Sequence, residues 1–331
     1  MNIAVKRRVA IAGCLTALLL ASPAKAQPLR KVVVSQLFQG IMFLPLYVAM
    51  DHGFFEGQGL AVTKQTAGSP NAALSAVISG SAQFSLHGPE WTAVAAAKGA
   101  NVQVIGGVVN RAAVWIVATP SMNYAGPKDL AGHVVSTGMM PIASTSLFTK
   151  LLADSGVDSS TSNITIKQVQ AGSELGPLLA GQSDVAVLYQ PALEQAVAKG
   201  FKVVVSFPQV YGPYLLSAIS ARKNVDPDTA ERFIGGLQQA LQFMQANPQE
   251  ATKIAKKEFP TIEPAIVEAA VKRMIDEKVY ATSVAISPAS FSTAMATQVT
   301  LGNLKSQPVY QDLVATSIID GATKRAGSQR Q

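Results

Sequence analysis

Cysteine is almost absent from this chain, which has a single cysteine, Cys14, among its 331 residues. One cysteine cannot form an internal disulfide, and beyond Cys14 there is no residue for a zinc–thiolate site or a thiol nucleophile. The fold must therefore rest on a hydrophobic core. A chain of this length can bury a substantial one, and the length is typical of about two domains.

The motifs of common enzyme classes are also missing. There is no P-loop, no G-x-G-x-x-G that opens a helix, no G-x-S-x-G elbow and no cluster of histidine and carboxylate at metal spacing. The three histidines, His52, His87 and His133, fall in separate segments. Only His87, at the end of the predicted strand 82–86, lies where a ligand would bind. We therefore predict no catalytic residue, no cofactor and no metal site.

Long hydrophobic runs are confined to the N-terminus. The basic residues Lys6-Arg7-Arg8 precede an apolar stretch over 9–21, and Ala24-Lys25-Ala26 has the small-x-small pattern of a cleavage site. The apolar stretch is shorter than the roughly 20 residues that a membrane-spanning helix needs. We predict a signal peptide over 1–26, cleaved after Ala26, and export to the periplasm.

Two alternatives for the N-terminus stay open. Ile11-Ala12-Gly13-Cys14 matches a lipoprotein cleavage box, although only about five apolar residues precede Cys14, fewer than such a signal needs. Lipidation at Cys14 would also leave the apolar stretch 15–21 on the mature protein. The Arg7-Arg8 pair is compatible with a twin-arginine signal, so the export route is not settled.

The excess of positive charge is small once the signal peptide is removed. Four of the 27 lysines and arginines lie in it and none of the 20 acidic residues does, so the mature balance is 23 − 20 = +3. This gives weak support to an anionic ligand and none to nucleic acid. The basic residues Lys324, Arg325 and Arg330 are typical of a solvated chain end.

Strand and helix patterns alternate from Lys31 to about Ser220. Helix ends are marked by Ser69-Pro70, an N-cap followed by proline, and by glycines such as Gly53 and Gly80. Further helices are predicted to start at Gly88-Pro89, at Ser144 or Thr145, and near 173 and 191. The predicted strands are 31–36, 60–64, 82–86, 102–106, 113–118, 133–137, 163–169, 184–188, 202–206 and 215–220.

After Asn224 the pattern predicts helices alone. One begins at Asp226-Pro227, and Asn247-Pro248-Gln249-Glu250 reads as a capping box with proline at the first helical position. Others are expected at about 263–278, 288–305 and 309–319. Alternating strands and helices followed by a helical tail indicate an α/β protein with appended helices.

Several short segments carry a family resemblance. "PLYVA", "GFFE" and "GLAV" over 45–62, Asp129-Leu130-Ala131-Gly132, and the segment 180–184 resemble solute-binding proteins of ABC importers for nitrate, sulfonate, taurine and thiamine-pyrimidine precursors. The resemblance implies a two-lobed periplasmic-binding-protein fold of type II, with two open sheets flanked by helices and a hinged cleft. It also implies chain crossings near 111–118 and 211–220 and extra C-terminal helices on lobe 1. The expected division is 1–26 signal peptide, 27–112 lobe 1, 113–216 lobe 2 and 217–331 the helical return to lobe 1.

The resemblance further implies that the ligand is held between the lobes by helix N-termini, where free N–H groups and the helix dipole favour oxygen atoms and anions. Ser69 and Ser144 lie at such ends, although each could simply cap its helix. Aromatic and polar residues at strand ends are the second group of candidates. The predicted ligand-binding residues are Gln36, Phe38, Gln39, Ser69, His87, Glu90, Trp91, Arg111, Ser144, Thr145 and Tyr189.

Two charged candidates point to different ligands. Arg111, at the first crossing, could hold a carboxylate or sulfonate, or could be a surface residue of the hinge. Glu90, in the first turn of its helix, would oppose an anion if it faced the cleft and would favour an amine or aminopyrimidine. We expect a small sulfonate-like or carboxylate-like anion, with a flat heteroaromatic such as a thiamine pyrimidine precursor as the alternative.

The predicted function is therefore capture of a small solute by cleft closure, as the monomeric binding component of an ABC importer that docks on membrane permease subunits. An exported sensor for a membrane signalling partner is an alternative that the sequence does not separate from transport. The resemblance also includes a fungal-type pyrimidine-precursor synthase, which relies on a cysteine-rich segment and a cofactor lysine. The lack of cysteine after Cys14 argues against that enzyme.

Overall fold

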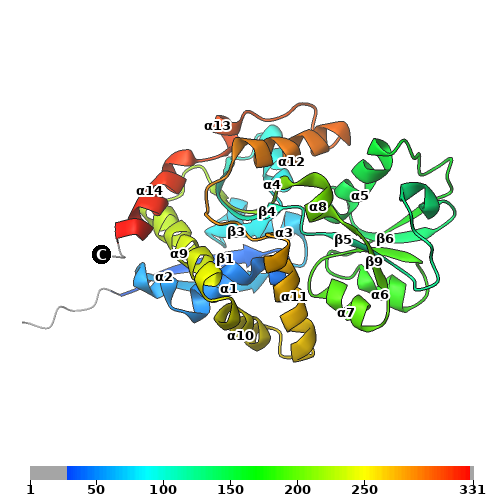
Figure 1. Cartoon of the computed structure of the whole chain (residues 1–331). Coiled ribbons are helices and arrows are strands. Elements are labelled where there is room, and N and C mark those ends of the chain that lie inside the picture. Colours follow the sequence, from blue (N-terminus) through cyan, green and yellow to red (C-terminus); the bar gives the residue numbers. More distant parts are fainter. Residues whose placement is uncertain (1–27, 329–331) are drawn as a thin grey trace, which may run out of the picture.

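The computed structural model describes residues 28–328 and has two β-sheets flanked by helices. Figure 1 shows them as two lobes side by side, lobe 1 around the first sheet and lobe 2, in green, around the second. The predicted signal peptide and Cys14 lie outside the described residues. No helix within 28–328 is long and apolar enough to cross a membrane.

The sheet of lobe 1 has the strand order β2-β1-β3-β10-β4. β1 pairs in parallel with β2 and β3, while β10 is antiparallel to both β3 and β4. The centre of β1 is the run Val32-Val33-Val34, whose branched side chains suit a strand between two layers. The bounds are β1 Arg30–Gln36, β2 Leu60–Thr66, β3 Phe84–His87, β4 Val102–Arg111 and β10 Pro213–Arg222.

The sheet of lobe 2 repeats this topology with the order β7-β6-β8-β5-β9. β6 is parallel to β7 and β8, and β5 is antiparallel to β8 and β9. The bounds are β5 Trp115–Ala118, β6 Val134–Gly138, β7 Thr165–Val169, β8 Val185–Leu188 and β9 Lys202–Ser206. Ligands of open α/β sheets bind beyond the carboxyl ends of the parallel strands, so a binding site is expected at this edge of each sheet.

Short helices connect the strands within each lobe. Those of lobe 1 are η1 Ile41–Phe43, α1 Leu44–Asp51, α2 Phe54–Gly57, α3 Pro70–Ser79 and α4 Pro89–Ala97. Those of lobe 2 are η2 Pro127–Leu130, α5 Ala143–Asp154, α6 Leu175–Leu179 and α7 Ala192–Ala198, and α8 Phe207–Tyr211 lies on the way back to lobe 1.

The C-terminal helices cover lobe 1 and reach toward lobe 2. α9 packs on α1, α2 and α14, and α10 packs on α1, whereas α11 contacts α7 and α12 contacts α5 of lobe 2 (Figure 1). Their bounds are α9 Pro227–Ala246, α10 Pro248–Glu258, α11 Pro264–Asp276, α12 Pro288–Thr300, α13 Tyr310–Leu313 and α14 Thr316–Ser328. The tail is therefore a bridge between the lobes as well as a cover.

All ten predicted strands are present within 28–328, with ends shifted by a few residues. The prediction of one helix over 309–319 is wrong, because the chain forms α13 and α14 with an extended residue between them. Val314 has φ −104° and ψ 118° and forms a parallel bridge with Val104 at the edge of the first sheet. Pairing with that strand edge replaces a helical turn. The short helices α2 and α8 were not predicted.

Most helix ends follow the sequence, but the one at Asn247 does not. The Ser69 hydroxyl accepts a hydrogen bond from the Ala72 N–H at 3.1 Å, and Gly53 and Gly80 have the positive φ values of 72° and 86° that glycine accommodates. The capping box at Asn247 is wrong. Its side-chain amide donates to the Phe243 carbonyl at 3.1 Å, so it closes the end of α9 instead of capping α10.

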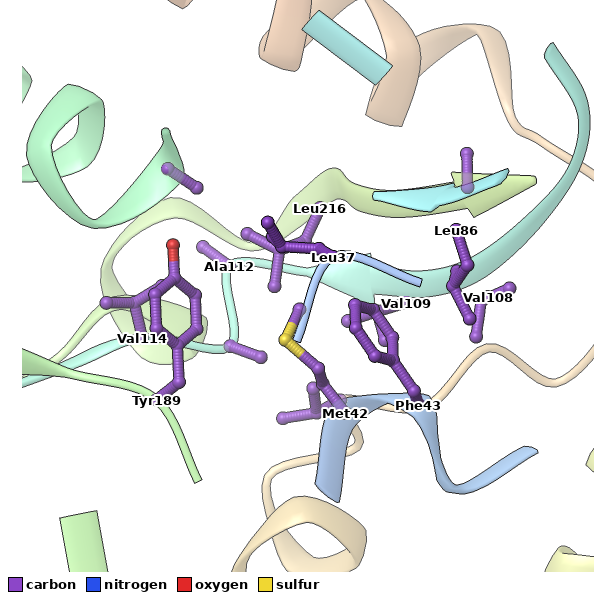
Figure 2. Packing of buried hydrophobic residues seen from close by; sticks show 14 of the residues in the cluster. Leu37, Met42, Phe43, Leu86, Val108, Val109, Ala112, Val114, Tyr189 and Leu216 are labelled. Carbon is purple, nitrogen blue, oxygen red and sulfur yellow. The ribbon is translucent and has the colours of Figure 1, made fainter. Parts of the chain in front are cut away.

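The chain crosses between the lobes twice. The first crossing is the segment 112–114 between β4 and β5, and the second is α8 with Gly212, between β9 and β10. Trp115 begins β5 and is fully buried, as expected for a core residue. One hydrophobic cluster runs through both crossings into the two lobes, and Figure 2 labels part of it, including Leu37, Ala112, Val114, Tyr189 and Leu216.

Candidate functional site

The candidate site lies where the carboxyl ends of β1 and β3 in lobe 1 meet the ends of β6 and β8 in lobe 2. The Phe38 ring, after β1, is 5.5 Å from the Tyr189 ring, after β8, and 5.7 Å from Phe43. The Gln170 side chain of lobe 2 donates to the Gly68 carbonyl of lobe 1 at 3.2 Å. The two lobes are thus in contact across the cleft, and the polar groups between them are shielded from solvent.

His87 ends β3 and its ring is held inside lobe 1. Its Nδ1 lies 2.8 Å from the Gly88 carbonyl, which can only accept, so Nδ1 carries the proton. Its Nε2 then accepts from the Ser85 hydroxyl at 3.0 Å. Burial lowers the pKa of His87 to about 4, because the charged ring would lose its hydration. The neutral ring therefore has both nitrogens engaged by lobe 1.

Glu90 lies in the first turn of α4 and is a buried acid. Its side chain is 3% exposed and folds back over Gly88, where there is no room for a Cβ atom. Burial raises the pKa of Glu90 to about 8, although a hydrogen bond to its own backbone partly offsets this. At neutral pH Glu90 is therefore mostly protonated, and it resists becoming an anion unless a positive group comes close.

Tyr214, at the start of β10, is the buried neighbour of Glu90 on lobe 1. Burial and the nearby Glu90 carboxyl raise its pKa above the ordinary range. Thr297 and Gln298 of α12 are further polar neighbours of Tyr214. It was not among the predicted site residues, and only its position beside Gly212-Pro213 at the second crossing could have drawn attention to it.

On lobe 2 the start of α5 forms a compact hydrogen-bonded turn with the end of β6. Ser144 Oγ accepts from the Gly138 N–H at 3.1 Å, and the Thr145 hydroxyl donates to the Gly138 carbonyl. Ser144 was expected to cap the helix, but Ile142 occupies the N-cap position and Ser144 lies within the first turn. Its own N–H is 2.9 Å from the Tyr189 hydroxyl oxygen and donates to it. Ser144 and Thr145 are both buried.

Tyr189 and Glu174 complete the lobe 2 side. Glu174 precedes α6 and is 1% exposed, and its Oε1 has no hydrogen-bond partner among the described residues. Burial raises the pKa of Glu174 to about 7. Burial also raises the pKa of Tyr189, and the carboxyls of Glu174 and of Glu90 add to the shift. One phenol oxygen is therefore within electrostatic reach of a carboxyl from each lobe.

Glu174 was missed by the sequence reading, although a signal for it exists. It follows β7 by a few residues and begins a short helix, as Glu90 does after β3. Its backbone carbonyl accepts from the Ser136 hydroxyl of β6 at 2.7 Å, which fixes it beside that strand. A carboxylate at a helix start is common because of the helix dipole, so the pattern alone does not distinguish Glu174 from an exposed capping residue.

Trp91 and Phe38 are half-buried aromatic neighbours of this region. The indole Nε1 of Trp91 is buried and has no partner among the described residues. A buried N–H without a hydrogen-bond acceptor lowers the stability of the fold, and a bound ligand is one possible acceptor for it. Phe38 also lies close to Gly172 of lobe 2, where a Cβ would be 3.6 Å from Phe38 Cγ.

Other predicted residues are bound within lobe 1. The Gln36 side chain donates to the Thr66 hydroxyl at 2.9 Å and accepts from the Tyr47 hydroxyl at 2.9 Å. Ser69 caps α3. Gln39 donates to the Glu258 carboxylate at 2.9 Å and borders a cavity of about 460 Å³ between the lobes. That cavity is lined from lobe 2 by Gly172, Pro191, Ala192 and Gln195, so it opens beside Phe38.

Arg111 stands apart from the buried acids. It ends β4, and its guanidinium donates to the Pro208 carbonyl of α8 at 3.1 Å. This bond joins the strand before the first crossing to the helix of the second. Arg111 thus contacts the second crossing, while its part in ligand binding stays a prediction.

Comparison with known proteins identifies a family and a relative that are similar to this chain. The profile of a family described as NMT1/THI5 like matches residues 41–251, more than half of the chain. YtlA of Bacillus subtilis (strain 168), whose name describes a candidate binding protein, is 22% identical over 315 residues, which cover 92% of this chain and 93% of YtlA.

Solved structures with the same fold include proteins of different roles. The alkanesulfonate-binding protein SsuA from Xanthomonas axonopodis pv. citri, bound to MOPS, has a TM-score of 0.70 at 16% identity and covers 86% of this chain and 97% of its own. The desulfurization enzyme DszB has a TM-score of 0.66 at 9% identity, covering 89% and 99%. At these identities the likeness concerns the fold alone.

Proposed function

Because the chain belongs to the NMT1/THI5-like family, we propose that it is the extracytoplasmic solute-binding component of an ABC importer. The observation that carries the proposal is the set of buried polar groups between the lobes. Glu90, Ser144, Glu174 and Tyr189 are each 5% exposed or less and come from both sides of the cleft. Within the described residues, Glu174 Oε1 and the nearby Trp91 Nε1 are buried without a partner, and a small solute enclosed between two lobes would supply one.

Capture would proceed by hinge closure. The lobes are joined by 112–114 and by the segment with α8 and Gly212, so rotation about these two short connections would open the cleft. We propose that the protein works in the periplasm as a monomer, after cleavage at Ala26, and that its closed form docks on permease subunits. No bond is made or broken in this cycle.

For the solute we propose a small, flat compound with hydrogen-bond donors, such as an amino-substituted heteroaromatic ring. Glu90 is buried at the cleft whereas Arg111 is bonded at the hinge, and this favours the alternative named from the sequence over a sulfonate or carboxylate. Phe38, Trp91 and Tyr189 would offer aromatic faces. The starts of α4 and α5 would suit an anion, so sulfonates belong in the test.

A ligand screen tests the proposal. The chain from residue 27 is unfolded, refolded to remove any carried ligand, and heated with sulfonates, carboxylates, nitrate, aminopyrimidines or amines. A solute at about 100 times its dissociation constant should add about 2.7 kcal/mol to the free energy of unfolding, a clear rise in melting temperature. Nuclear magnetic resonance of the bound solute should show no product. A complete lack of binding, or turnover of the solute, contradicts the proposal.

Partner and location need separate experiments. Light scattering of the purified chain should give the mass of one copy. In the producing cells, deletion of the permease genes should abolish uptake of the solute that the screen identifies. Uptake that persists, together with solute-dependent binding to a membrane kinase, would replace transport by sensing.

A further inference from the structure

Two buried acids, one from each lobe, lie near the same phenol. Glu90 belongs to lobe 1 and Glu174 to lobe 2, and both carboxyls act electrostatically on Tyr189. Glu174 lies against the end of β6, where a Cβ added at Gly138 would be 3.0 Å from its Oε1 and 2.9 Å from Ser144 Oγ. The unpartnered Oε1 thus lies beside the start of α5, in a wall that glycine keeps open.

No positive side chain balances these acids. α4 packs on α3, α12, β4 and β10, and of these α3 and α12 carry no ionisable side chain. β4 and β10 supply Tyr214, Arg111 and Arg222, but Arg111 is bonded to Pro208 and Arg222 lies beside Gly80 at the far end of α3. His87, next to α4, is neutral with both nitrogens engaged.

The surroundings of Glu174 are similar. α6 packs on α7, β6 and β8, and the ionisable groups in or next to these elements include Glu194 of α7 and Tyr189 after β8. The Glu194 carboxylate is held by Arg273 at 2.5 Å, so that cation is already paired. Among residues 28–328, no lysine or arginine forms an ion pair with Glu90 or Glu174, whereas Glu194 and Glu277 are both paired with Arg273. The site therefore has two acids and lacks a cation.

We propose that Glu90 and Glu174 form a clamp, one carboxyl from each lobe, that selects a cationic solute with an amidine-type group whose N–H donors point to both lobes. The inference rests on the proposed solute-binding function and narrows its ligand class. An amidinium is flat and has two nitrogens that can each donate to a carboxylate. It would engage the free Oε1 of Glu174 and bring the Glu90 carboxyl a partner from outside lobe 1.

Binding then exchanges protons for the ligand's charge. Without ligand and near neutral pH, Glu90 is mostly protonated and Glu174 partly protonated, since burial penalises the ionised form and raises both pKa values. When the cation enters, a carboxyl O–H bond breaks, the proton passes to solvent, and the carboxylate accepts an N–H from the ligand. One or two protons leave for each cation bound, so affinity should increase with pH up to about the pKa of Glu90, about 8.

For an anionic ligand the pH dependence of the affinity would have the opposite sign. It would be held only by protonated carboxyls that donate their O–H groups, and its binding would take up protons or leave them in place. Affinity for an anion would therefore fall as pH rises. The direction of the pH dependence separates the two ligand classes even when both bind.

The test uses benzamidine, benzamide and benzoate, which share a flat shape and differ in charge. Isothermal titration calorimetry of the chain from residue 27, in two buffers of different ionisation enthalpy, measures affinity and the number of protons exchanged. Benzamidine should bind at least about tenfold more tightly than benzamide or benzoate, as expected for charge-assisted hydrogen bonds. It should release protons at about pH 6.5 and few at about pH 9.

Two variants and one control separate the clamp from general effects. Glu90→Gln and Glu174→Gln should each weaken benzamidine by about tenfold or more, and each should reduce the number of protons released. Glu56→Gln changes an exposed glutamate of α2 and should alter neither quantity. Circular dichroism confirms that each variant is folded, and a variant that does not fold is replaced by the Asp substitution, which keeps the acid and shifts its position.

Different results would contradict the clamp and the proposed solute-binding function. Tighter binding of benzoate than of benzamidine, or proton uptake on binding, overturns the clamp and leaves solute capture in place. The clamp also falls if the earlier screen finds a solute but none of the three probes binds, or if both glutamine variants bind benzamidine normally. Lack of binding in both screens would overturn solute capture itself.

Discussion

Arg273 of α11 and Glu194 of α7 form an ion pair between the C-terminal helices and lobe 2, with Nε and Oε1 2.5 Å apart. Glu194 is nearly buried, its side chain being 7% exposed, and also accepts from the Gln190 amide at 2.9 Å. Gln190 directly follows Tyr189, and its carbonyl accepts from the Ile41 N–H of lobe 1 at 3.4 Å. The ion pair thus connects the contact between α11 and α7 with Gln190, the neighbour of Tyr189 in the candidate site.

Replacing Arg273 should favour the open form. Arg273→Met leaves Glu194 nearly buried without its cation, which should lower the free energy of unfolding by about 2 kcal/mol and weaken ligand binding although no ligand contact is removed. Small-angle X-ray scattering should give a larger radius of gyration. Lys272→Met, on the same helix and 72% exposed in its side chain, is the control. Unchanged scattering and affinity in Arg273→Met would exclude this role.

Glu277 should hold the two crossings together. Its carboxylate accepts from the Trp115 indole at 3.0 Å and from the Ser206 hydroxyl at 2.5 Å, so it contacts the lobe 2 ends of both connections. Glu277→Leu removes both acceptors and leaves a buried indole N–H unpaired, a cost of about 1–3 kcal/mol. Glu277→Gln keeps one acceptor and should cost less. Thermal unfolding measures the loss of stability in each variant. An equal loss in Glu277→Leu and Glu277→Gln would contradict this role of Glu277.

Gly138→Ala should disrupt the lobe 2 wall of the site. Its Cβ would approach Ile142 Cγ2 at 2.6 Å, Ser144 Oγ at 2.9 Å and Glu174 Oε1 at 3.0 Å. Overpacking of this size costs about 1–3 kcal/mol, and the forced shift of Glu174 should weaken the ligand further. Gly126→Ala, where a Cβ meets nothing within 4 Å, is the matched control. Denaturant unfolding and ligand titration of both variants give the comparison.

The stability of the protein without ligand should fall as pH rises through about 7 to 8. Burial raises the pKa of Glu174 from 4.5 to about 7 and that of Glu90 from 4.5 to about 8, so the folded state binds more protons than the unfolded state in this range. Unfolding free energy then decreases with pH. His87, with its pKa lowered from 6.5 to about 4, acts in the opposite direction, but only below about pH 6.5.

Melting temperatures between about pH 6.5 and about pH 8.5 check this sign. The decrease should be smaller in Glu90→Gln, because a neutral amide replaces an acid that must otherwise ionise while buried. Glu56→Gln should follow the parent chain. A melting temperature that rises over this window would show that the two carboxyls are ionised in the folded protein.

The order of strands and helices was predictable because local chemistry determines it. Val32-Val33-Val34 has no favourable alternative to a buried strand, and Ser69-Pro70 with Gly80 marks both ends of α3. The predictions failed where a distant group decided the outcome. Val314 left the helical pattern to pair with Val104, and the Asn247 amide turned to the end of α9.

Only part of the candidate site could be predicted from the sequence. Glu90, Ser144, Thr145 and Tyr189 were named from helix starts and strand ends, and the structure brings them to one region. Glu174 was not named, because a carboxylate at the start of a short helix looks like any exposed cap. Whether such an acid is buried depends on what packs over it, which the local sequence does not encode.

By itself the sequence determined the α/β class, the ten strands, most helix ends and the resemblance to solute-binding proteins, because all of these follow from local periodicity and short motifs. Tertiary structure alone decided which charges face the cleft. It joined Arg111 to Pro208 at the hinge and placed Glu90 and Glu174 on opposite lobes around Tyr189. The physical reason is that burial sets the cost of a charge, and burial is decided by packing between segments that are far apart in the chain.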